Sequence, residues 1–310
     1  MPAHISESGP VPASSPVAAP VCLTLAMILV GSSVVAGKIM VAELPVQFAS
    51  ALRFALALLI LLPLLHAREG GLPRLSRRSW LVLAAQALCG SFLFTVCLLH
   101  GLALTSPASA GIITATTPAC MGLMAWLGMR ERPTLRVGLG MVLSVAGLLA
   151  VNVVASAPSS GAPAPLMGNL LVLGAVLFES LFLLLRKAVP EPLTPLAAST
   201  VVSLFGLVWF LPGAVIDLVL VIPAAGGLAA VSATGWLSVA YYGVFVTVLA
   251  YLLWFAGITR VAASTAGVFT AVMPVSALAL SALILSEPAS LPQLVGCACV
   301  LAGIVLISRR

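Results

Sequence analysis

The chain is dominated by apolar segments that run for 18 or more residues; none of the residues from Ser79 to Met129, for example, is charged. An α-helix needs about 20 apolar residues to cross a bilayer, whereas the strands of a membrane β-barrel would alternate apolar and polar side chains. With 62% hydrophobic and 7% charged residues, the chain has too few polar side chains to cover a water-exposed globule. The sequence therefore predicts an all-α polytopic membrane protein.

Ten spans account well for the length of 310 residues. Residues 1–20, rich in Pro, Ala and Ser and without Lys or Arg, are expected to form a disordered cytoplasmic tail. The stretch 214–234, which contains Asp217, Pro223 and the pair Gly226-Gly227, is expected to be mainly a loop. The predicted spans are 21–41, 46–66, 80–104, 107–128, 134–154, 166–186, 193–213, 235–258, 261–285 and 290–308.

The basic residues predict the orientation of these spans. If the N-terminus is cytoplasmic, twelve of the fourteen Lys and Arg residues lie on the cytoplasmic side, in agreement with the positive-inside rule. The opposite orientation would place the same twelve residues outside. We therefore expect a multi-pass protein of the cell inner (plasma) membrane with both termini cytoplasmic.

The sequence also contains an internal repeat at an offset of 156 residues. Over the 68 pairs that begin at Trp80 and end at Gly147, 16 are identical, where about seven are expected by chance. Earlier segments match more weakly at an offset of 148, which pairs Glu43 with Glu191. The difference between the two offsets fits an insertion around residues 213–232.

Each repeat contains five spans, and an odd number reverses the direction of the chain across the membrane. We therefore predict ten transmembrane helices arranged as two inverted five-helix repeats, residues 21–155 and 166–308, joined by a linker at 156–165. Such inverted repeats are the geometry of alternating access, because each half can adopt the conformation of the other.

Four short motifs follow one another along the chain: Gly31-Ser32-Ser33 leading to Lys38, Ala51-Leu52-Arg53-Phe54, Thr117-Pro118 and Arg130-Glu131-Arg132. In this order they resemble the EamA-type members of the drug/metabolite transporter superfamily, over residues 21 to 308. The resemblance implies an exporter or exchanger of small metabolites, including amino acids, with a central cavity lined mainly by helices 1 to 4 and 6 to 9. The chain departs from the family in having Val30 where Trp is common.

Two ionisable residues deep in spans are the main candidates for function, because each costs about 2.5–3.5 kcal/mol to insert. The guanidinium of Arg53 can bind a substrate carboxylate or phosphate; a structural ion pair or bonds to helix carbonyls are the alternatives. Its repeat counterpart is Val201, so an anion clamp would be one-sided. Glu179 can carry protons in antiport or bind a substrate amine, or it can pair with Arg53 or Lys38 or anchor a helix.

Two further ionisable residues lie nearer the outer ends of their spans. Lys38 is expected to attract an anionic group together with Arg53, but its long stem can also reach the outer headgroups. His100 is a second candidate for proton coupling, because histidine changes charge near neutral pH. A histidine satisfied by local bonds at a helix end is the alternative.

Prolines interrupt two spans at repeat-equivalent positions. Pro118 and Pro274 lack an amide hydrogen, so the carbonyls of Thr114 and Thr270 lose their usual helical partner. Such a carbonyl is tolerated within a membrane where a hydroxyl, water or ligand replaces the bond. Thr114, Pro118 and Thr270 are therefore candidate substrate-binding residues, with a simple packing kink as the alternative.

Polar and aromatic residues complete the candidate binding set. Gln86, opposite Tyr242 in the repeat, and Tyr251 with Trp254 one turn later can hold an amphiphilic solute. Tyr and Trp also anchor helices at membrane interfaces, which is the alternative role for such residues.

The sequence lacks motifs for other chemistry. The sequence has one Asp and no hydrolase elbow, zinc motif or phosphate-binding loop, so we expect no enzyme, catalytic residue, metal site, cofactor or nucleic-acid partner. The six cysteines lie in apolar segments without Cys-x-x-Cys spacing and are expected to be packing thiols.

The sequence therefore predicts a secondary active transporter that exports or exchanges a small organic metabolite, such as an amino acid or a related amphiphile, by alternating access. Its expected partners are this metabolite, membrane lipid, and a proton or counter-metabolite. A membrane-embedded enzyme acting on a lipid-linked substrate and a passive channel or scramblase are the alternatives. The identity of the substrate and the oligomeric state stay open.

Overall fold

The computed structural model describes residues 18–114, 163–186, 191–258, 272–286 and 291–308, and the single residues 116, 117, 120, 124, 139, 142, 143, 146, 189, 260 and 269. Every regular element in these ranges is helical, in agreement with the predicted all-α fold. The predicted fifth span, 134–154, lies almost entirely outside the described residues, as do Pro118 and Thr270.

Within its described residues, the first half of the chain forms three long helical segments and a shorter one. Their apolar side chains point in all directions, as expected for helices surrounded by lipid and by other helices, where every backbone polar group must be bonded within its own segment. The elements are α1 (Ala18–Glu43), α2 (Val46–Glu69), a continuous segment of α3 (Arg77–Ala87), η1 (Leu88–Leu93) and α4 (Phe94–Leu104), and α5 (Pro107–Thr114).

The second half follows the same plan. Its elements are α8 (Pro165–Arg186), a segment of α9 (Pro195–Ile216), η2 (Asp217–Val221) and α10 (Ile222–Ala224), the short η3 (Leu228–Ala230), a segment of α11 (Ala233–Tyr241), η4 (Tyr242–Leu249) and α12 (Ala250–Ile258), then α14 (Val272–Ile284) and α15 (Leu291–Ser308).

Within the described part of the chain, six helical segments are long and apolar enough to cross a membrane. This establishes a multi-pass architecture on length and composition. The segments are Ala19–Glu43, Val46–Glu69, Arg77–Leu104, Pro165–Phe182, Pro195–Ala224 and Ala233–Gly257.

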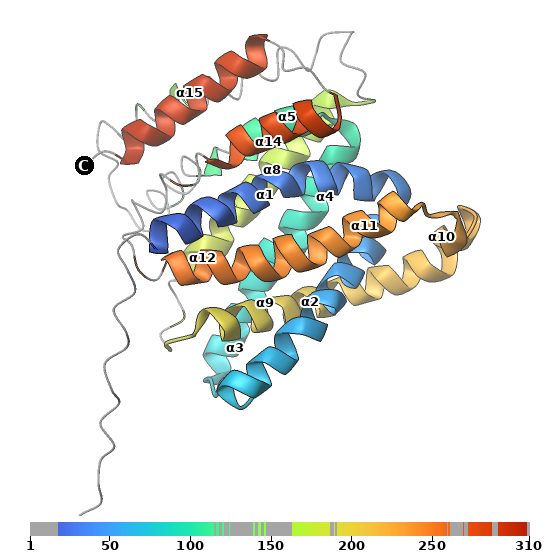
Figure 1. Cartoon of the computed structure of the whole chain (residues 1–310), viewed down its shortest axis with the longest axis vertical. Coiled ribbons are helices and arrows are strands. Elements are labelled where there is room, and N and C mark those ends of the chain that lie inside the picture. Colours follow the sequence, from blue (N-terminus) through green and yellow to red (C-terminus); the bar gives the residue numbers. More distant parts are fainter. Residues whose placement is uncertain are drawn as a thin grey trace, which may run out of the picture.

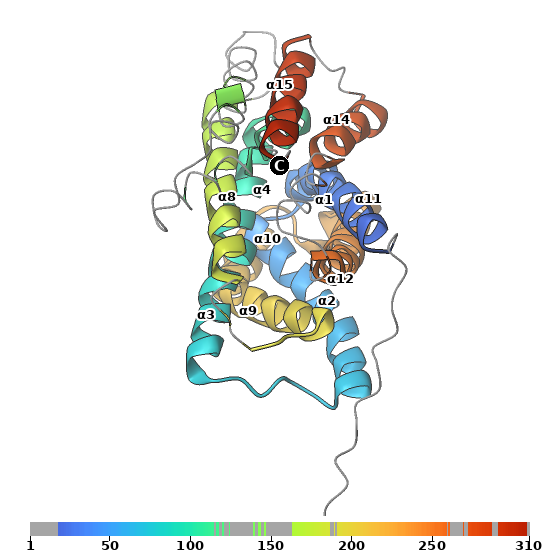
Figure 2. The same cartoon turned by 90° about the vertical axis from the view of Figure 1, so that its left-hand side faces the viewer.

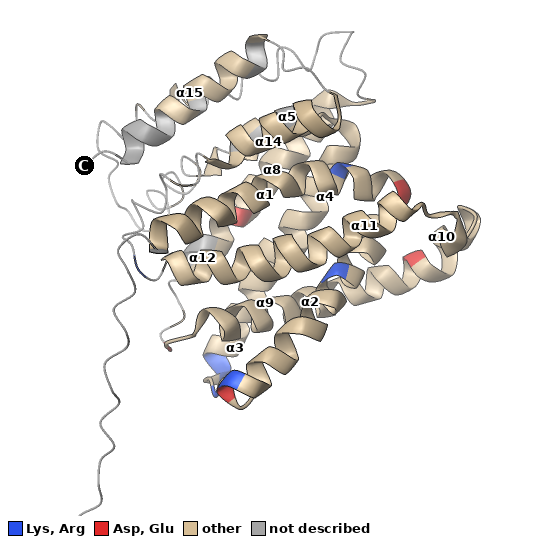
Figure 3. Ribbon diagram, in the orientation of Figure 1, with Lys and Arg blue, Asp and Glu red and all other residues tan. Residues whose placement is uncertain are grey.

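The helices pack as a bundle in which elements of the two halves lie side by side (Figures 1 and 2). One apolar core joins α1, α4 and α8 through Met40, Leu99 and Val172, all fully buried. A second core joins α2 and α9 through residues that include Leu61 and Val201. Charged side chains are sparse, and most of those described lie near helix ends (Figure 3).

The prediction of a loop over 214–234 is wrong for its first half, because the helix continues to Ala224. The carboxylate of Asp217 does not break the helix, since it accepts a hydrogen bond of 3.0 Å from the amide of Phe48 at the start of α2. The helix ends where Gly226 and Gly227 adopt φ of 95° and 78°, conformations that glycine reaches without steric cost.

Two segments of π-helix interrupt the third and eighth predicted spans at equivalent points of the repeat. At the offset of 156, η1 corresponds to residues 244–249 of η4. In η4 the hydroxyl of Thr247 donates a 3.0 Å bond to the carbonyl of Tyr242, five residues earlier. Single π-turns often occur at functional sites, and both of these segments contribute to the pocket described below.

Candidate functional site

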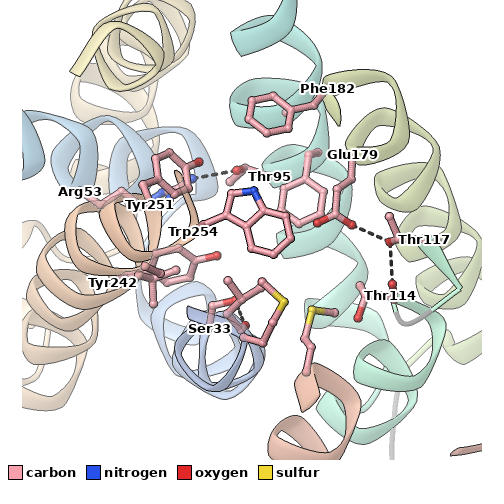
Figure 4. A pocket seen from close by; sticks show the side chains of 17 residues that line it. Ser33, Arg53, Thr95, Thr114, Thr117, Glu179, Phe182, Tyr242, Tyr251 and Trp254 are labelled. Carbon is pink, nitrogen blue, oxygen red and sulfur yellow. Dashed lines mark hydrogen bonds between the residues drawn. The ribbon is translucent and has the colours of Figure 1, made fainter. Parts of the chain in front are cut away.

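A cavity of about 130 Å³ lies between the helices, and Figure 4 shows the side chains that line it. Residues from α1, α2, α4, α5, η1, α8, η4, α12 and α14 line it, so both halves of the chain contribute. Five of the residues predicted from the sequence as substrate-binding or coupling residues are among them: Arg53, Thr114, Glu179, Tyr251 and Trp254.

Arg53 is buried on α2, with 3% of its surface exposed. Its guanidinium nitrogens donate hydrogen bonds to the hydroxyl of Thr95 at 2.7 Å and to that of Thr247 at 3.1 Å. The guanidinium carbon also lies 4.2 Å from the ring centroid of Phe54 and 4.5 Å from that of Tyr242. The two rings and two hydroxyls hold the planar cation in a fixed orientation.

These partners of Arg53 are all uncharged, so they orient the cation without neutralising it. Its Nε atom is buried and has no hydrogen-bond partner among the described residues. A buried cation whose hydrogen-bonding capacity is not filled is able to bind an anionic group of a solute.

Glu179 lies on α8 across the pocket from Arg53, with Trp254 between them in the view of Figure 4. Its carboxyl oxygen Oε2 is 2.7 Å from the hydroxyl of Thr117. The same hydroxyl is 2.7 Å from the carbonyl oxygen of Thr114, the group that loses its usual amide partner to Pro118. Side-chain hydroxyls are a known replacement for the missing helical bond, which agrees with the expectation from the sequence.

The Thr117 hydroxyl has one hydrogen and two acceptors when Glu179 is ionised. It can then satisfy either the carboxylate or the Thr114 carbonyl, but not both. When Glu179 is protonated, its own O–H can donate to Thr117, whose hydrogen remains directed at Thr114. The hydrogen-bond chain from Glu179 to the Thr114 carbonyl is therefore complete only in the protonated state.

The rest of the pocket wall is mainly apolar and aromatic. Such side chains provide contact area for an apolar part of a solute, while the few polar groups fix its orientation. Besides Tyr251 and Trp254, the wall includes Met27, Phe94, Phe182, Tyr242 and Met273.

Lys38, by contrast, is not among the pocket residues. Its ammonium donates hydrogen bonds of 2.6 Å to the carbonyl of Leu102 and 3.0 Å to that of Thr105, at the C-terminal end of α4. The last carbonyls of a helix have no intrahelical donor and carry partial negative charge, so a cation is favourable there. The ammonium is thus engaged with the protein backbone.

The other two predicted residues that the structure describes, Gln86 and His100, are also not among the pocket residues. Gln86 is fully buried on α3 and donates a 3.1 Å bond to the carbonyl of Phe182, which ties α3 to α8. His100 is exposed on α4, with Nδ1 only 2.8 Å from the carbonyl of Val96 in its own helix. Both side chains contact backbone carbonyls, whereas the sequence predicted that Gln86 binds solute and that His100 exchanges protons.

Sequence reasoning missed the hydroxyl groups that orient the two charged residues. A signal for one of them is present, because Thr95 is the repeat counterpart of Tyr251, which was selected. Thr117 was noted only as a member of a motif, and nothing in the local sequence singles out Thr247. Among the described residues, no group of three or more His, Cys, Asp or Glu is arranged to hold a metal ion.

The chain is similar, over almost its whole length, to proteins named as uncharacterized transporters. "Uncharacterized transporter YetK" of Bacillus subtilis (strain 168) is 40% identical over 301 residues, which cover 97% of this chain and 90% of the relative. "Uncharacterized transporter YyaM" of the same organism is 24% identical over 292 residues, or 92% of this chain and 94% of that protein.

A solved crystal structure also matches, with a TM-score of 0.63 over 93% of this chain and 95% of that one. At 19% identity, this likeness shows a similar fold alone. The model of the EamA-like transporter family matches residues 18–153 and, a second time, residues 166–309. With both halves matched and a 40% identical transporter covering nearly the whole chain, the protein is a multi-pass membrane protein that belongs to the EamA-like transporter family of the drug/metabolite transporter superfamily.

Proposed function

We propose that this protein is a secondary active transporter that exports or exchanges a small organic metabolite with an anionic and a cationic group, such as an amino acid. The observation that carries the proposal is the placement of Arg53 and Glu179 on one pocket without a hydrogen bond between them among those described. Arg53 binds the carboxylate of the solute. Glu179 either lies next to the amine of the solute or exchanges a proton for the solute.

The size of the pocket supports a compact solute. Its volume of about 130 Å³ is below the roughly 300–1,000 Å³ of pockets for drug-sized ligands. The aromatic and methionine side chains accommodate the apolar portion of the same molecule. The hydrogen-bond chain through Thr117 supports proton exchange at Glu179, because gain or loss of the proton changes which acceptor the hydroxyl serves.

Transport proceeds in this proposal by alternating access of two inverted repeats, residues 21–155 and 166–308, in the inner membrane with both termini cytoplasmic. The two matches of the family model and the equivalent positions of η1 and η4 support the repeat. The distribution of Lys and Arg supports the orientation.

The proposal is tested in two steps with the purified full-length protein. A thermal-shift screen of metabolites first finds solutes that raise the unfolding temperature, since selective binding stabilises the folded state. The best solute is then loaded into proteoliposomes, and its flux is measured with and without a pH gradient. We expect saturable flux that responds to the gradient in the native protein and loses this response in Glu179→Gln.

Glu69→Gln serves as the matched control, because Glu69 is an exposed carboxylate at the end of α2 and is not among the pocket residues. Flux that does not saturate with solute would favour a passive channel. A flux that does not change with the pH gradient and is the same in Glu179→Gln would disprove the coupling role of this residue.

A further inference from the structure

Four carboxylates each bind the N-terminal end of a helix from the other half of the chain. Glu43 and Glu69 end α1 and α2 in the first half, while Asp217 and Glu191 belong to the second. At the offset of 148, Glu43 is the counterpart of Glu191, and Glu69 is the counterpart of Asp217. The four contacts therefore form two related pairs.

The first contact joins α1 to α11. The carboxylate of Glu43 accepts a 2.7 Å bond from the backbone amide of Ser232 and another of 2.7 Å from its hydroxyl. Ser232 is the N-cap of α11, and its hydroxyl also accepts from the amide of Gly235 at 3.1 Å. A carboxylate is favoured at this place by the unpaired amides and the partial positive charge of a helix N-terminus.

The second contact is the counterpart of the first, with the halves exchanged. The carboxylate of Glu191, in the connection between α8 and α9, accepts bonds from the hydroxyls of Ser76 and Ser79, that from Ser76 being 2.8 Å long. Ser76 is the N-cap of α3 and corresponds to Ser232 at the offset of 156. Each half thus supplies one carboxylate and one N-cap serine.

The two contacts lie at opposite ends of the bundle. Glu43 is two residues before Pro45, the N-cap of α2, whereas Ser76 follows the other end of α2 at Glu69. The 24 residues of α2 span about 36 Å at 1.5 Å per residue. In Figure 1 the end of α1 and the start of α11 lie at the right, and the start of α3 lies at the lower left.

Each contact also joins two segments that line the pocket. The first links α1, which contributes Val30 and Ser33 to the wall, to the segment that continues into η4. The second links the segment that continues into η1 and α4 to the connection that follows α8, the helix that contributes Glu179 and Phe182. Loss of either contact would allow the adjoining walls of the pocket to separate at one face only.

We propose that Glu43–Ser232 and Glu191–Ser76 are two latches that close the pocket at its two faces, and that one of them breaks each time the transporter opens. The inference rests on the alternating access of the proposed function. Both latches are formed in this structure. Glu43, Ser232 and Ser76 are exposed and Glu191 is partly buried, so water can replace these hydrogen bonds when a contact breaks during a cycle.

The other two carboxylates join α2 to α9, and they provide the controls. Asp217 accepts the bond from Phe48 described above, and Glu69 accepts a 2.8 Å bond from the hydroxyl of Thr194, the N-cap of α9. These two helices are also joined by the stacked rings of Phe54 and Phe210, 5.9 Å apart and fully buried. We therefore assign these two helices to a unit that stays together.

The test measures access to the pocket from each face. A full-length variant without its six native cysteines carries Ser33→Cys as a reporter in the pocket wall, and sealed vesicles of both orientations are treated with a membrane-impermeant maleimide. We expect Glu43→Ala to raise labelling from one face about threefold, and Glu191→Ala to raise it from the opposite face by a similar factor. Ser232→Ala and Ser76→Ala remove one hydroxyl donor from each contact and leave its other bonds, so they should produce smaller shifts in the same two directions.

Asp217→Ala and Glu69→Ala remove a carboxylate from the same two faces and should leave the ratio of labelling from the two sides unchanged. The latches are disproved if Glu43→Ala and Glu191→Ala favour the same face, leave the ratio unchanged, or act no differently from these controls. Labelling needs no substrate. If the variants shift access although no solute is transported, the result supports the latches and contradicts only the proposed function.

Discussion

Arg53 and Glu179 line one pocket from opposite halves of the chain, and the described hydrogen bonds of each are to threonine hydroxyls. A direct ion pair would have neutralised both charges within the protein. Hydroxyl partners instead fix the position of each group while preserving its capacity to interact with a solute.

Replacing Arg53 by Lys should weaken solute binding although the positive charge is retained. A single ammonium cannot bond to Thr95 and Thr247 in the planar geometry of the guanidinium, nor stack between Phe54 and Tyr242. We expect the KM of transport in proteoliposomes to rise about tenfold, as a loss of about 1.4 kcal/mol would cause. Arg74→Lys, on the exposed connection between α2 and α3, should leave KM unchanged. An unaltered KM in Arg53→Lys would exclude Arg53 from the binding site.

Replacing Thr117 by Val should impair the response to a pH gradient. The variant removes the hydroxyl that bridges Glu179 and the Thr114 carbonyl, so the proton on Glu179 no longer determines the bonding of that carbonyl. The ratio of flux with and without the gradient, measured in proteoliposomes, should fall toward one. Thr116→Val is the matched control, since its hydroxyl donates to the carbonyl of Ile113 and not to Glu179. Equal effects of the two variants would show that the bridge has no specific role.

Lys38→Met should destabilise the protein and leave solute affinity almost unchanged. The ammonium satisfies two carbonyls at the end of α4, and its loss leaves them without these donors. We expect a loss of about 1–2 kcal/mol, seen as a lower unfolding temperature in detergent. Arg74→Met, at an exposed site, should have no such effect. A rise in KM without loss of stability would instead support the substrate role predicted from the sequence.

The contribution of Glu191 to stability should disappear in acid. The hydroxyls of Ser79 and then Ser76 bond to its carboxylate and hold its pKa at about 2, below the usual 4.5. A carboxyl whose pKa is lower in the folded state stabilises fully above 4.5, and this stabilisation is lost as the pH falls toward 2. The unfolding temperatures of the native protein and Glu191→Gln should therefore differ at about pH 6 and converge between about pH 4 and 2. A difference in unfolding temperature that does not change with pH would contradict this contact.

Gly206→Ala should disturb the packing that supports Arg53, because Gly206 on α9 faces the Phe54 ring. A β-carbon at this position would lie 2.9 Å from atoms of the Phe54 ring, which stacks on Phe210 and contacts the guanidinium. We expect a loss of about 1–3 kcal/mol and a higher KM. Gly174→Ala, where the nearest atom would be 3.8 Å away, is the matched control for a glycine in a helix. Equal stability of the two variants would show that this packing contact is dispensable.

Several features of the fold were predictable from the sequence because they depend on local properties. The helical segments that contain the first, second, third, sixth and eighth predicted spans begin and end within a few residues of the predicted bounds. The length and apolarity of a span depend only on consecutive residues, since each helix satisfies its own backbone hydrogen bonds. The loop expected over 214–234 failed because the bond from Phe48 to Asp217 depends on a helix 169 residues away in the chain.

The candidate site was predictable only to a limited extent. Arg53 and Glu179 stand out from the sequence because charge within a span is costly, and both line the pocket. The same reasoning selected Lys38 and His100 as well, although the carbonyls of Leu102 and Val96 engage their side chains. Distance along the chain does not reveal which carbonyl, hydroxyl or pocket a long side chain can reach.

The sequence by itself thus determined that the chain crosses the membrane in many apolar helices, that it repeats, and that it resembles a family of transporters. Only the tertiary structure decided that Thr117 connects Glu179 to Thr114, and that Glu43 meets Ser232 while Glu191 meets Ser76. The physical reason is that apolar length acts residue by residue along one helix. Hydrogen bonds between distant segments depend instead on how each helix is rotated and packed against partners far away in the chain.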